Sequence, residues 1–179
     1  MPQGAVNPGT EVHVELDIPS HWEWRDGPVE PGPAVVFDID GVLSDATNRQ
    51  HFLEGEGDKR DWRGFFDACG DDPLLEDVAG LVEVIDPHLT VVLLTGRPVR
   101  VQPATLAWLE RYAVRWDLLI MRNRGDYSTA PEFKRQTVGE LRERGFDLRL
   151  AFEDDVRNRD MFKSEGVRCV YIHSGYYEN

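Results

Sequence analysis

The sequence predicts an α/β domain with a mostly parallel, five-stranded sheet flanked by helices. Two observations carry this prediction: short apolar runs recur along residues 34–179, and segments with helical signals stand between several of them. Such alternation favours parallel pairing through right-handed crossovers, with helices on both faces of the sheet. The runs expected to form strands are Ala34–Phe37, Leu89–Leu94, Leu118–Met121, Leu148–Phe152 and Val167–Ile172.

Residues 1–33 differ in composition from the domain at 34–179 and are predicted to form an N-terminal arm. Prolines interrupt this arm, but Glu11–Ile18 alternates apolar and polar residues, as a half-buried strand does. This strand could add to the sheet edge or pair with a second copy of the chain in a homo-oligomer, and the sequence leaves both alternatives open. Trp22 and Trp24 are expected to pack as anchors.

Three segments carry the signals of helices. Pro131 lies at the start of Glu132–Arg144 and Gly145 follows it, which suits the two ends of a helix. The other two are Val156–Glu165 and Pro103–Ala113.

The stretch 45–87 is longer than a simple crossover needs and is rich in glycine and acidic residues. We expect a loop with a short helical element that overhangs the ligand-binding edge as a minimal cap.

Composition limits the classes of function. No apolar run is long enough for a membrane span and no signal-peptide layout occurs, so a cytoplasmic protein without membrane contact is expected. Cys69 and Cys169 lack C-x-x-C spacing, which argues against a zinc site. The formal net charge of −13 opposes binding of extended nucleic acid but is compatible with a short end held in a local basic pocket.

The first predicted strand runs directly into two acids. Asp38 and Asp40 follow the apolar run Ala34–Phe37, and Gly41 comes next. Side chains at i and i+2 of an extended segment share a face, so both carboxylates are expected at the carboxyl edge of the sheet, where α/β proteins bind ligands. Two carboxylates this close repel each other, and a divalent cation such as Mg²⁺ is the simplest compensation.

Further polar residues are expected at the same edge. The second strand leads into Thr95, Gly96 and Arg97, whose hydroxyl, N–H groups and guanidinium suit phosphate oxygens. Lys134 stands in the first turn of a predicted helix, where its charge opposes the helix dipole, so an anionic partner would explain it. The fourth strand delivers three consecutive acids for which a metal role is expected: Glu153, Asp154 and Asp155.

Together these segments resemble the haloacid dehalogenase (HAD) superfamily over residues 34–175. The four motifs of that superfamily occur in order: DIDGV at Asp38–Val42, LLTGR at Leu93–Arg97, the lone Lys134, and EDD at Glu153–Asp155. The acid at Asp40 favours the phosphatases of the superfamily over its dehalogenases. The resemblance implies a Rossmann-like HAD fold and phosphoric monoester hydrolysis.

Within the superfamily, the chain resembles the 3′-phosphatase domain of phage-type polynucleotide kinases. This resemblance rests on FDIDGVL, on Arg49 downstream of it, on T-G-R, on the pattern at Leu150–Gly166, and on Ser174–Tyr176. Two features depart from the family. No P-loop pattern is present, and Ala130 stands where the family tends to carry an acidic residue one turn before Lys134.

The resemblance also implies a role for each motif residue. Asp38 would attack phosphorus to form a phosphoaspartyl intermediate, and Asp40 would act as general acid and then as general base. Asp38, the backbone carbonyl of Asp40, and Asp154 would hold Mg²⁺. Glu153 or Asp155 would support that site. The residues expected to bind the substrate are Thr95, Gly96, Arg97, Lys134 and Arg49.

Three functions remain open. The first is a Mg²⁺-dependent phosphomonoesterase acting on a nucleotide, a polynucleotide 3′-phosphate or a small phosphorylated metabolite. The second is a non-catalytic phosphate-binding or regulatory module, which would have no physical reason to keep a repulsive cluster of acids. The third is a phosphotransferase, which differs only in the group that accepts the phosphoryl.

Overall fold

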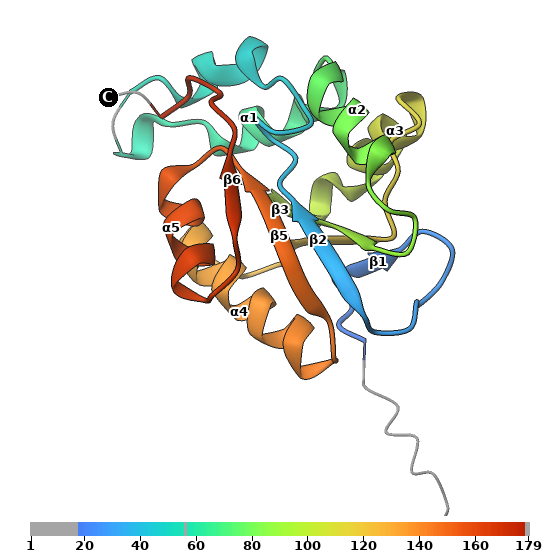
Figure 1. The fold of residues 1–179 in the computed structure, drawn as a ribbon. Helices are drawn as coiled ribbons and strands as arrows, with labels where there is room; N and C mark the ends of the chain where they lie inside the picture. Colours follow the sequence, from blue (N-terminus) through green and yellow to red (C-terminus); the bar gives the residue numbers. More distant parts are fainter. Residues whose placement is uncertain (1–17, 56, 178–179) are drawn as a thin grey trace, which may run out of the picture.

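The computed structural model describes residues 18–55 and 57–177 and contains one six-stranded sheet with the order β1-β4-β3-β2-β5-β6 (Figure 1). β1 runs antiparallel to β4, and all other neighbouring strands are parallel. The strands are β1 (Trp22–Trp24), β2 (Pro33–Phe37), β3 (Thr90–Pro98), β4 (Leu118–Arg122), β5 (Asp147–Glu153) and β6 (Cys169–Tyr171).

The predicted fold class is confirmed, because β2 to β6 correspond to the five predicted runs and pair in parallel. The sixth strand, β1, was not predicted at its position. It has only three residues, too few for a recognisable alternation, and Trp22 within it is buried in the core. The strand predicted at Glu11–Ile18 lies outside the described residues, apart from Ile18, which is in no strand.

The α-helices are α1 (Trp62–Asp67), α2 (Glu76–Val84), α3 (Gln102–Arg111), α4 (Ala130–Glu143) and α5 (Val156–Ser164). Short 3-10 helices are η1 (Thr47–Leu53), η2 (Gly57–Lys59), η3 (Cys69–Asp71) and η4 (Val99–Val101). The three predicted helices therefore exist as α4, α5 and α3, and their ends differ from the predicted ones by at most two residues, which is the normal uncertainty of helix termini.

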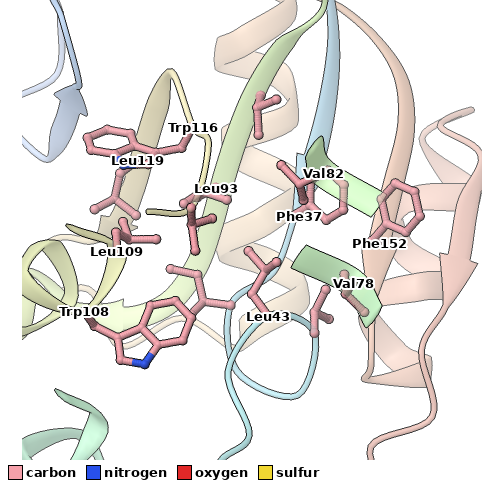
Figure 2. Packing of buried hydrophobic residues seen from close by; sticks show 14 of the residues in the cluster. Phe37, Leu43, Val78, Val82, Leu93, Trp108, Leu109, Trp116, Leu119 and Phe152 are labelled. Carbon is pink, nitrogen blue, oxygen red and sulfur yellow. The ribbon is translucent and has the colours of Figure 1, made fainter. Parts of the chain in front are cut away.

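Two apolar cores lie on the two faces of the sheet, because successive side chains of a strand point to opposite faces. Val35 and Phe37 of β2 join the core beneath α2 and α3, whereas Ala34 and Val36 join the core beneath α4 and α5. Figure 2 shows part of the first core, where Phe37 lies among side chains from the sheet and from α2. Burial on both faces explains why β2 reads as an unbroken apolar run.

The stretch 45–87 contains more helical structure than the single short element that was predicted. α2 is the crossover helix, since Val78 and Val82 are buried against the sheet. The elements before it, η1, η2, α1 and η3, form the overhang near the carboxyl edge of the sheet, at the top of Figure 1. We call the segment 47–71 the overhang.

Parallel pairing of β5, β2 and β3 brings the residues that follow these strands to one edge. Phe37 and Phe152 lie side by side just below that edge, with ring centroids 4.3 Å apart and planes inclined by 3°. Within the described part of the chain, no helix has the length and apolar character needed to span a membrane.

Candidate active site

The carboxyl end of β2 presents both of its acids to one cleft. The backbone N–H of Asp38 donates to the carbonyl of Phe152 at 3.1 Å, so Asp38 still follows the line of the sheet. The N–H of Ile39 then donates to Oδ1 of Asp38 at 2.7 Å, where the chain begins to turn. The side chains of Asp38 and Asp40 line the same cleft.

Asp38, Lys134, Glu153 and Asp154 form a buried group that we call the lysine cluster. Nζ of Lys134 lies 2.9 Å from Oδ2 of Asp38 and 2.6 Å from Oε2 of Glu153. α4 begins at Ala130 behind a capping box at Thr129, so Lys134 is its fifth residue and lies in the second turn of the helix rather than in the first turn, as predicted. The lysine thus has two anionic partners, Asp38 and Glu153, which explains a buried positive charge near the start of this helix.

Asp154 differs from the other acids of the lysine cluster. Both of its oxygens are buried, and neither accepts a hydrogen bond of ordinary geometry from residues 18–55 or 57–177. One carboxylate oxygen each from Asp38, Glu153 and Asp154 lie within 4.8 Å of one another. Buried carboxylates without partners are costly unless a cation compensates them, and an all-oxygen donor set suits Mg²⁺. The residues present therefore fit a magnesium site.

The charges of the lysine cluster do not balance without such a cation. Burial raises the pKa of Asp38, and Glu153 adds to the rise while Lys134 opposes it. Burial also raises the pKa of Asp154, with Asp38 and Glu153 adding to the rise and the Ser174 side chain opposing it in part. Three carboxylates against one ammonium group leave an excess of two negative charges, which one divalent cation would cancel.

Gly41 allows Asp154 to occupy its position. Gly41 has φ +77°, and a Cβ at this residue would lie 2.0 Å from Oδ2 and 2.6 Å from Cγ of Asp154. Gly41→Ala should therefore displace the Asp154 carboxylate and lower phosphatase activity by at least about tenfold, in addition to the backbone strain of about 1–2 kcal/mol.

The matched control for this substitution is Gly166→Ala. Gly166 has a similar φ of +74°, but a Cβ there would meet nothing within 4 Å. The control carries comparable backbone strain and should keep its activity. Equal losses of activity in the two variants, measured by phosphate release, would show that strain rather than displacement of Asp154 is responsible.

Asp155 and Glu153, the two acids predicted as alternative supports for the metal, lie in different surroundings. Asp155 caps α5 by accepting from the N–H of Arg157 at 2.8 Å, and its Oδ2 lies 2.6 Å from the Arg157 guanidinium. Oε1 of Glu153 accepts from the N–H of Asp155 and from Nδ2 of Asn158, both at 3.2 Å. Glu153, not Asp155, has an oxygen close to Asp38 and Asp154.

A second buried group, the arginine cluster, contains Asp40, Arg49, Asp72 and Arg97. Oδ1 of Asp40 accepts from Nε and Nη2 of Arg97 at 2.9 and 2.6 Å, and also from Nη2 of Arg49. Asp72 accepts from Nε and Nη2 of Arg49 at 2.9 and 2.7 Å and lies 3.3 Å from Nη2 of Arg97. Burial alone would raise the pKa of Asp40, but the charges of Arg97 and Arg49 outweigh it and lower the pKa.

The remaining residues of the predicted substrate-binding set lie near these clusters. The Arg49 and Arg97 side chains are only 2% and 0% exposed, and both face Asp40 rather than open space. The hydroxyl of buried Thr95 accepts from the N–H of Arg97 at 3.2 Å, and Gly96 lines the cleft. The residues predicted from the sequence thus gather at one edge of the sheet, and the two arginines are buried beneath the cleft surface there.

Asp72 is a residue that the sequence did not single out. It lies in the stretch 45–87, outside every recognised motif, yet it is 2% exposed and also accepts a hydrogen bond from the Ser44 hydroxyl. Its neighbour Asp71 is exposed, and no spacing distinguishes the two aspartates. The sole sequence signal would have been the need for a second anion to balance two buried arginines.

An open cleft of about 1470 Å³ lies over both clusters. Asp38, Asp40 and Lys134 line it, together with residues of the overhang, the turn after β3, the loop before α4, the start of α5 and the C-terminal Tyr176 and Tyr177. The cleft is far larger than a phosphate ion, so the group that carries the phosphate has space to bind.

Comparison with known proteins agrees with this geometry. The family model for the polynucleotide kinase PNKP phosphatase domain matches residues 32–177. No curated protein matches the sequence.

Solved structures extend the comparison. A chain of the Pnkp1/Rnl/Hen1 RNA repair complex is similar with a TM-score of 0.64 and 24% identity, over 88% of this chain and 47% of that one. A chain of a second Pnkp1/Rnl/Hen1 structure is similar with a TM-score of 0.64 and 23% identity, over 89% of this chain and 50% of that one. A class C acid phosphatase from Bacillus anthracis with tungstate bound is similar with a TM-score of 0.50 and 18% identity, over 83% of this chain and 69% of that one. At these identities the likeness shows the fold alone, and this chain spans about half the length of the Pnkp1/Rnl/Hen1 chains.

Proposed function

The chain belongs to the polynucleotide kinase PNKP phosphatase domain family and is a phosphatase of HAD fold, and from this premise we propose that it is a Mg²⁺-dependent phosphomonoesterase that acts through a phosphoaspartyl intermediate on a nucleic-acid 3′-phosphate. The observation that carries the proposal is the lysine cluster. There, the Asp38 carboxylate lines an open cleft and lies beside Asp154, whose buried oxygens accept no hydrogen bond of ordinary geometry from the described residues.

Asp38 is the proposed nucleophile. Its Oδ1 accepts from the N–H of Ile39 and its Oδ2 lies against Lys134, so the carboxylate is held in one orientation at the cleft. Lys134, which Glu153 holds from its other side, is placed to contact the oxygens of the transferring phosphoryl group as well. The hydroxyl of Thr95 and the N–H of Gly96 are the further donors that we propose for these oxygens.

Asp38, Asp154 and the backbone carbonyl of Asp40 are proposed to hold Mg²⁺, with Glu153 in support. When bound, the cation would cancel the excess negative charge and allow an anionic nucleophile to approach an anionic phosphate.

Asp40 is the proposed proton carrier. Among the described residues, the hydrogen bonds that Asp40 accepts all go to Oδ1, from Arg49 and Arg97. Oδ2 is therefore the oxygen that we propose to protonate the leaving group and then to take a proton from the attacking water. We assign Arg49 and Arg97 the task of orienting Asp40, with Asp72 holding both guanidinium groups in turn.

A nucleic-acid end is the substrate class that we favour over a small metabolite. The cleft of about 1470 Å³ opens beside Asp38 without a large lid, so a bulky leaving group could enter without domain closure. Family membership and the fold shared with a chain of an RNA repair complex support the same choice. The test is Mg²⁺-dependent phosphate release from 3′-phosphorylated oligonucleotides, mononucleotides and sugar phosphates, and hydrolysis of sugar phosphates alone would contradict it.

The metal site is tested by binding rather than by activity. Mg²⁺ at 100 times its Kd should raise the free energy of unfolding of the parent protein by about 2.7 kcal/mol. Asp154→Asn removes one of the charges that bind the cation, so this stabilisation should disappear, while the metal-free variant should be at least as stable as the parent. Thermal unfolding with and without Mg²⁺ measures both effects.

Asp155→Asn is the matched control for this experiment. An asparagine can still cap α5, and Asp155 lies against Arg157 rather than near Asp38. This variant should keep most of the stabilisation by Mg²⁺. Loss of the response in Asp155→Asn together with its retention in Asp154→Asn would reverse the assignment.

A further inference from the structure

The exposed aromatic side chains of the protein gather at the cleft. In the part of the chain that the structure describes, three large aromatic side chains are strongly exposed: Trp62 at 49%, Tyr127 at 95% and Tyr177 at 48%. All three line the cleft above the two clusters. Exposed aromatic rings cost free energy in water, and their concentration at one site indicates a ligand with flat apolar faces.

Trp62 is the best supported of the three. It begins α1 in the overhang, and its ring lies 5.9 Å from Phe65, edge to face, and 6.0 Å from Phe66, with planes inclined by 28°. Phe65 is buried, and the guanidinium carbon of Arg49 lies 4.1 Å from the centre of its ring. Arg49 in turn contacts Asp40. The exposed indole therefore packs on two phenylalanines, and through Phe65 and Arg49 a chain of contacts connects it to Asp40, the proposed proton carrier.

Cations surround this aromatic surface. Arg100 pairs with Asp67 and donates to the carbonyl of Arg63 at 3.2 Å, which ties η4 to α1. The Arg63 side chain is 86% exposed, and its nearest acid, Asp67, is 3.7 Å away. Apart from the catalytic groups, the charged residues described at the cleft are Arg60, Arg63, Arg100, Arg122, Arg157, Glu54 and Asp155. Arginines predominate here although the formal net charge of the chain is −13.

We propose that Trp62 is a specificity-determining residue: the base of the nucleotide that carries the 3′-phosphate stacks on its exposed face, and Arg63 contacts the next phosphate along a single strand. This inference rests on the proposed function. Aromatic rings with neighbouring arginines are how proteins bind single strands with little sequence preference, because every base has a stacking face. An unpaired terminal base can turn onto a side chain without the cost of breaking a base pair, so a single-stranded end should be preferred over a blunt duplex.

The first test compares two substrates with each variant. Hydrolysis of a 3′-phosphorylated single-stranded oligonucleotide depends on both phosphate chemistry and contacts to the base. Hydrolysis of acetyl phosphate, which has no base, depends on the phosphate chemistry alone. Trp62→Ala should lower kcat/KM for the oligonucleotide about tenfold more than for acetyl phosphate, chiefly through KM. Trp62→Phe should restore most of the difference. Val84→Ala, at a residue 78% exposed on α2 and outside the cleft, is the control and should leave the ratio unchanged.

The second test uses salt. Removing one arginine that binds a phosphate of a single strand should reduce the slope of log KM against log salt concentration by about 0.7. Arg63→Gln should show this reduction with the oligonucleotide, and Arg149→Gln should not, since Arg149 pairs with Asp147 at the start of β5, away from the cleft.

The outcomes separate this inference from the proposed function. Equal effects of Trp62→Ala on both substrates, or none on either, would overturn the role of Trp62 and leave the phosphatase assignment intact. An unchanged salt slope in Arg63→Gln would remove the proposed interaction of Arg63 with phosphate. A parent enzyme that releases no phosphate from either substrate with Mg²⁺ present would contradict the proposed function itself.

Discussion

Asp38→Asn should abolish turnover. The substitution keeps nearly the same volume but removes the attacking oxyanion, so no phosphoenzyme can form and phosphate release should fall to the uncatalysed background. The fold should survive, because the change relieves repulsion between Asp38 and the neighbouring acids Glu153 and Asp154. Phosphate release from an aryl phosphate and from a 3′-phosphorylated oligonucleotide, together with circular dichroism, measures the two effects.

The control for this variant is Asp77→Asn, which changes an exposed acid of α2 that does not line the cleft. The control should retain parental activity on both substrates. Parental activity in Asp38→Asn would rule out Asp38 as the nucleophile, whichever substrate is used.

Asp40→Asn should slow the enzyme by an amount that depends on the leaving group. A sugar hydroxyl needs protonation to depart, so hydrolysis of the oligonucleotide should fall about 10²–10⁴-fold. The aryl oxide of an aryl phosphate departs with less help from an acid. The rate of its hydrolysis should therefore fall less, and phosphoenzyme should accumulate. The variant should also unfold more easily, because Arg49 and Arg97 would lose an anionic partner inside the arginine cluster.

Asp147→Asn is the matched control, since Asp147 also pairs with an arginine, Arg149, but at an exposed site. It should affect neither substrate. Equal losses on the two substrates in Asp40→Asn would contradict the role of Asp40 as proton carrier and would leave it only a structural part in the arginine cluster.

The sequence predicted those parts of the fold that depend on local pattern. Strands buried on both faces give continuous apolar runs, and such runs located β2 to β6. Pro131 and Gly145 marked the ends of α4 because each suits a particular backbone geometry at a helix terminus. In contrast, β1 is three residues long and is held by pairing with β4 and by burial of Trp22, neither of which leaves a periodic signal.

The candidate site could be located from the sequence but not resolved into its two clusters. The in-order motifs placed Asp38, Asp154 and Lys134 at one edge, since the carboxyl ends of neighbouring parallel strands lie together. No spacing indicated that Arg49 and Arg97 would face Asp40 instead of open space. Their orientation depends on Asp72, which reaches them from the stretch 45–87 only after the chain has folded.

The same reason explains why the aromatic surface was not expected. Trp62 was part of the predicted cap, but a tryptophan after a glycine-rich stretch is as compatible with a core residue as with a binding residue. Only its packing on Phe65 and Phe66, with half of its surface exposed, distinguishes the two.

The stereochemical course at phosphorus tests the central claim, a phosphoryl group carried by Asp38, most directly. A substrate whose transferred phosphoryl group is made chiral with oxygen isotopes and sulfur would be hydrolysed by the parent enzyme with Mg²⁺. Each in-line displacement inverts the configuration, so transfer to Asp38 followed by transfer to water predicts net retention. Net inversion would mean that water attacks the substrate directly, and it would contradict the phosphoaspartyl mechanism.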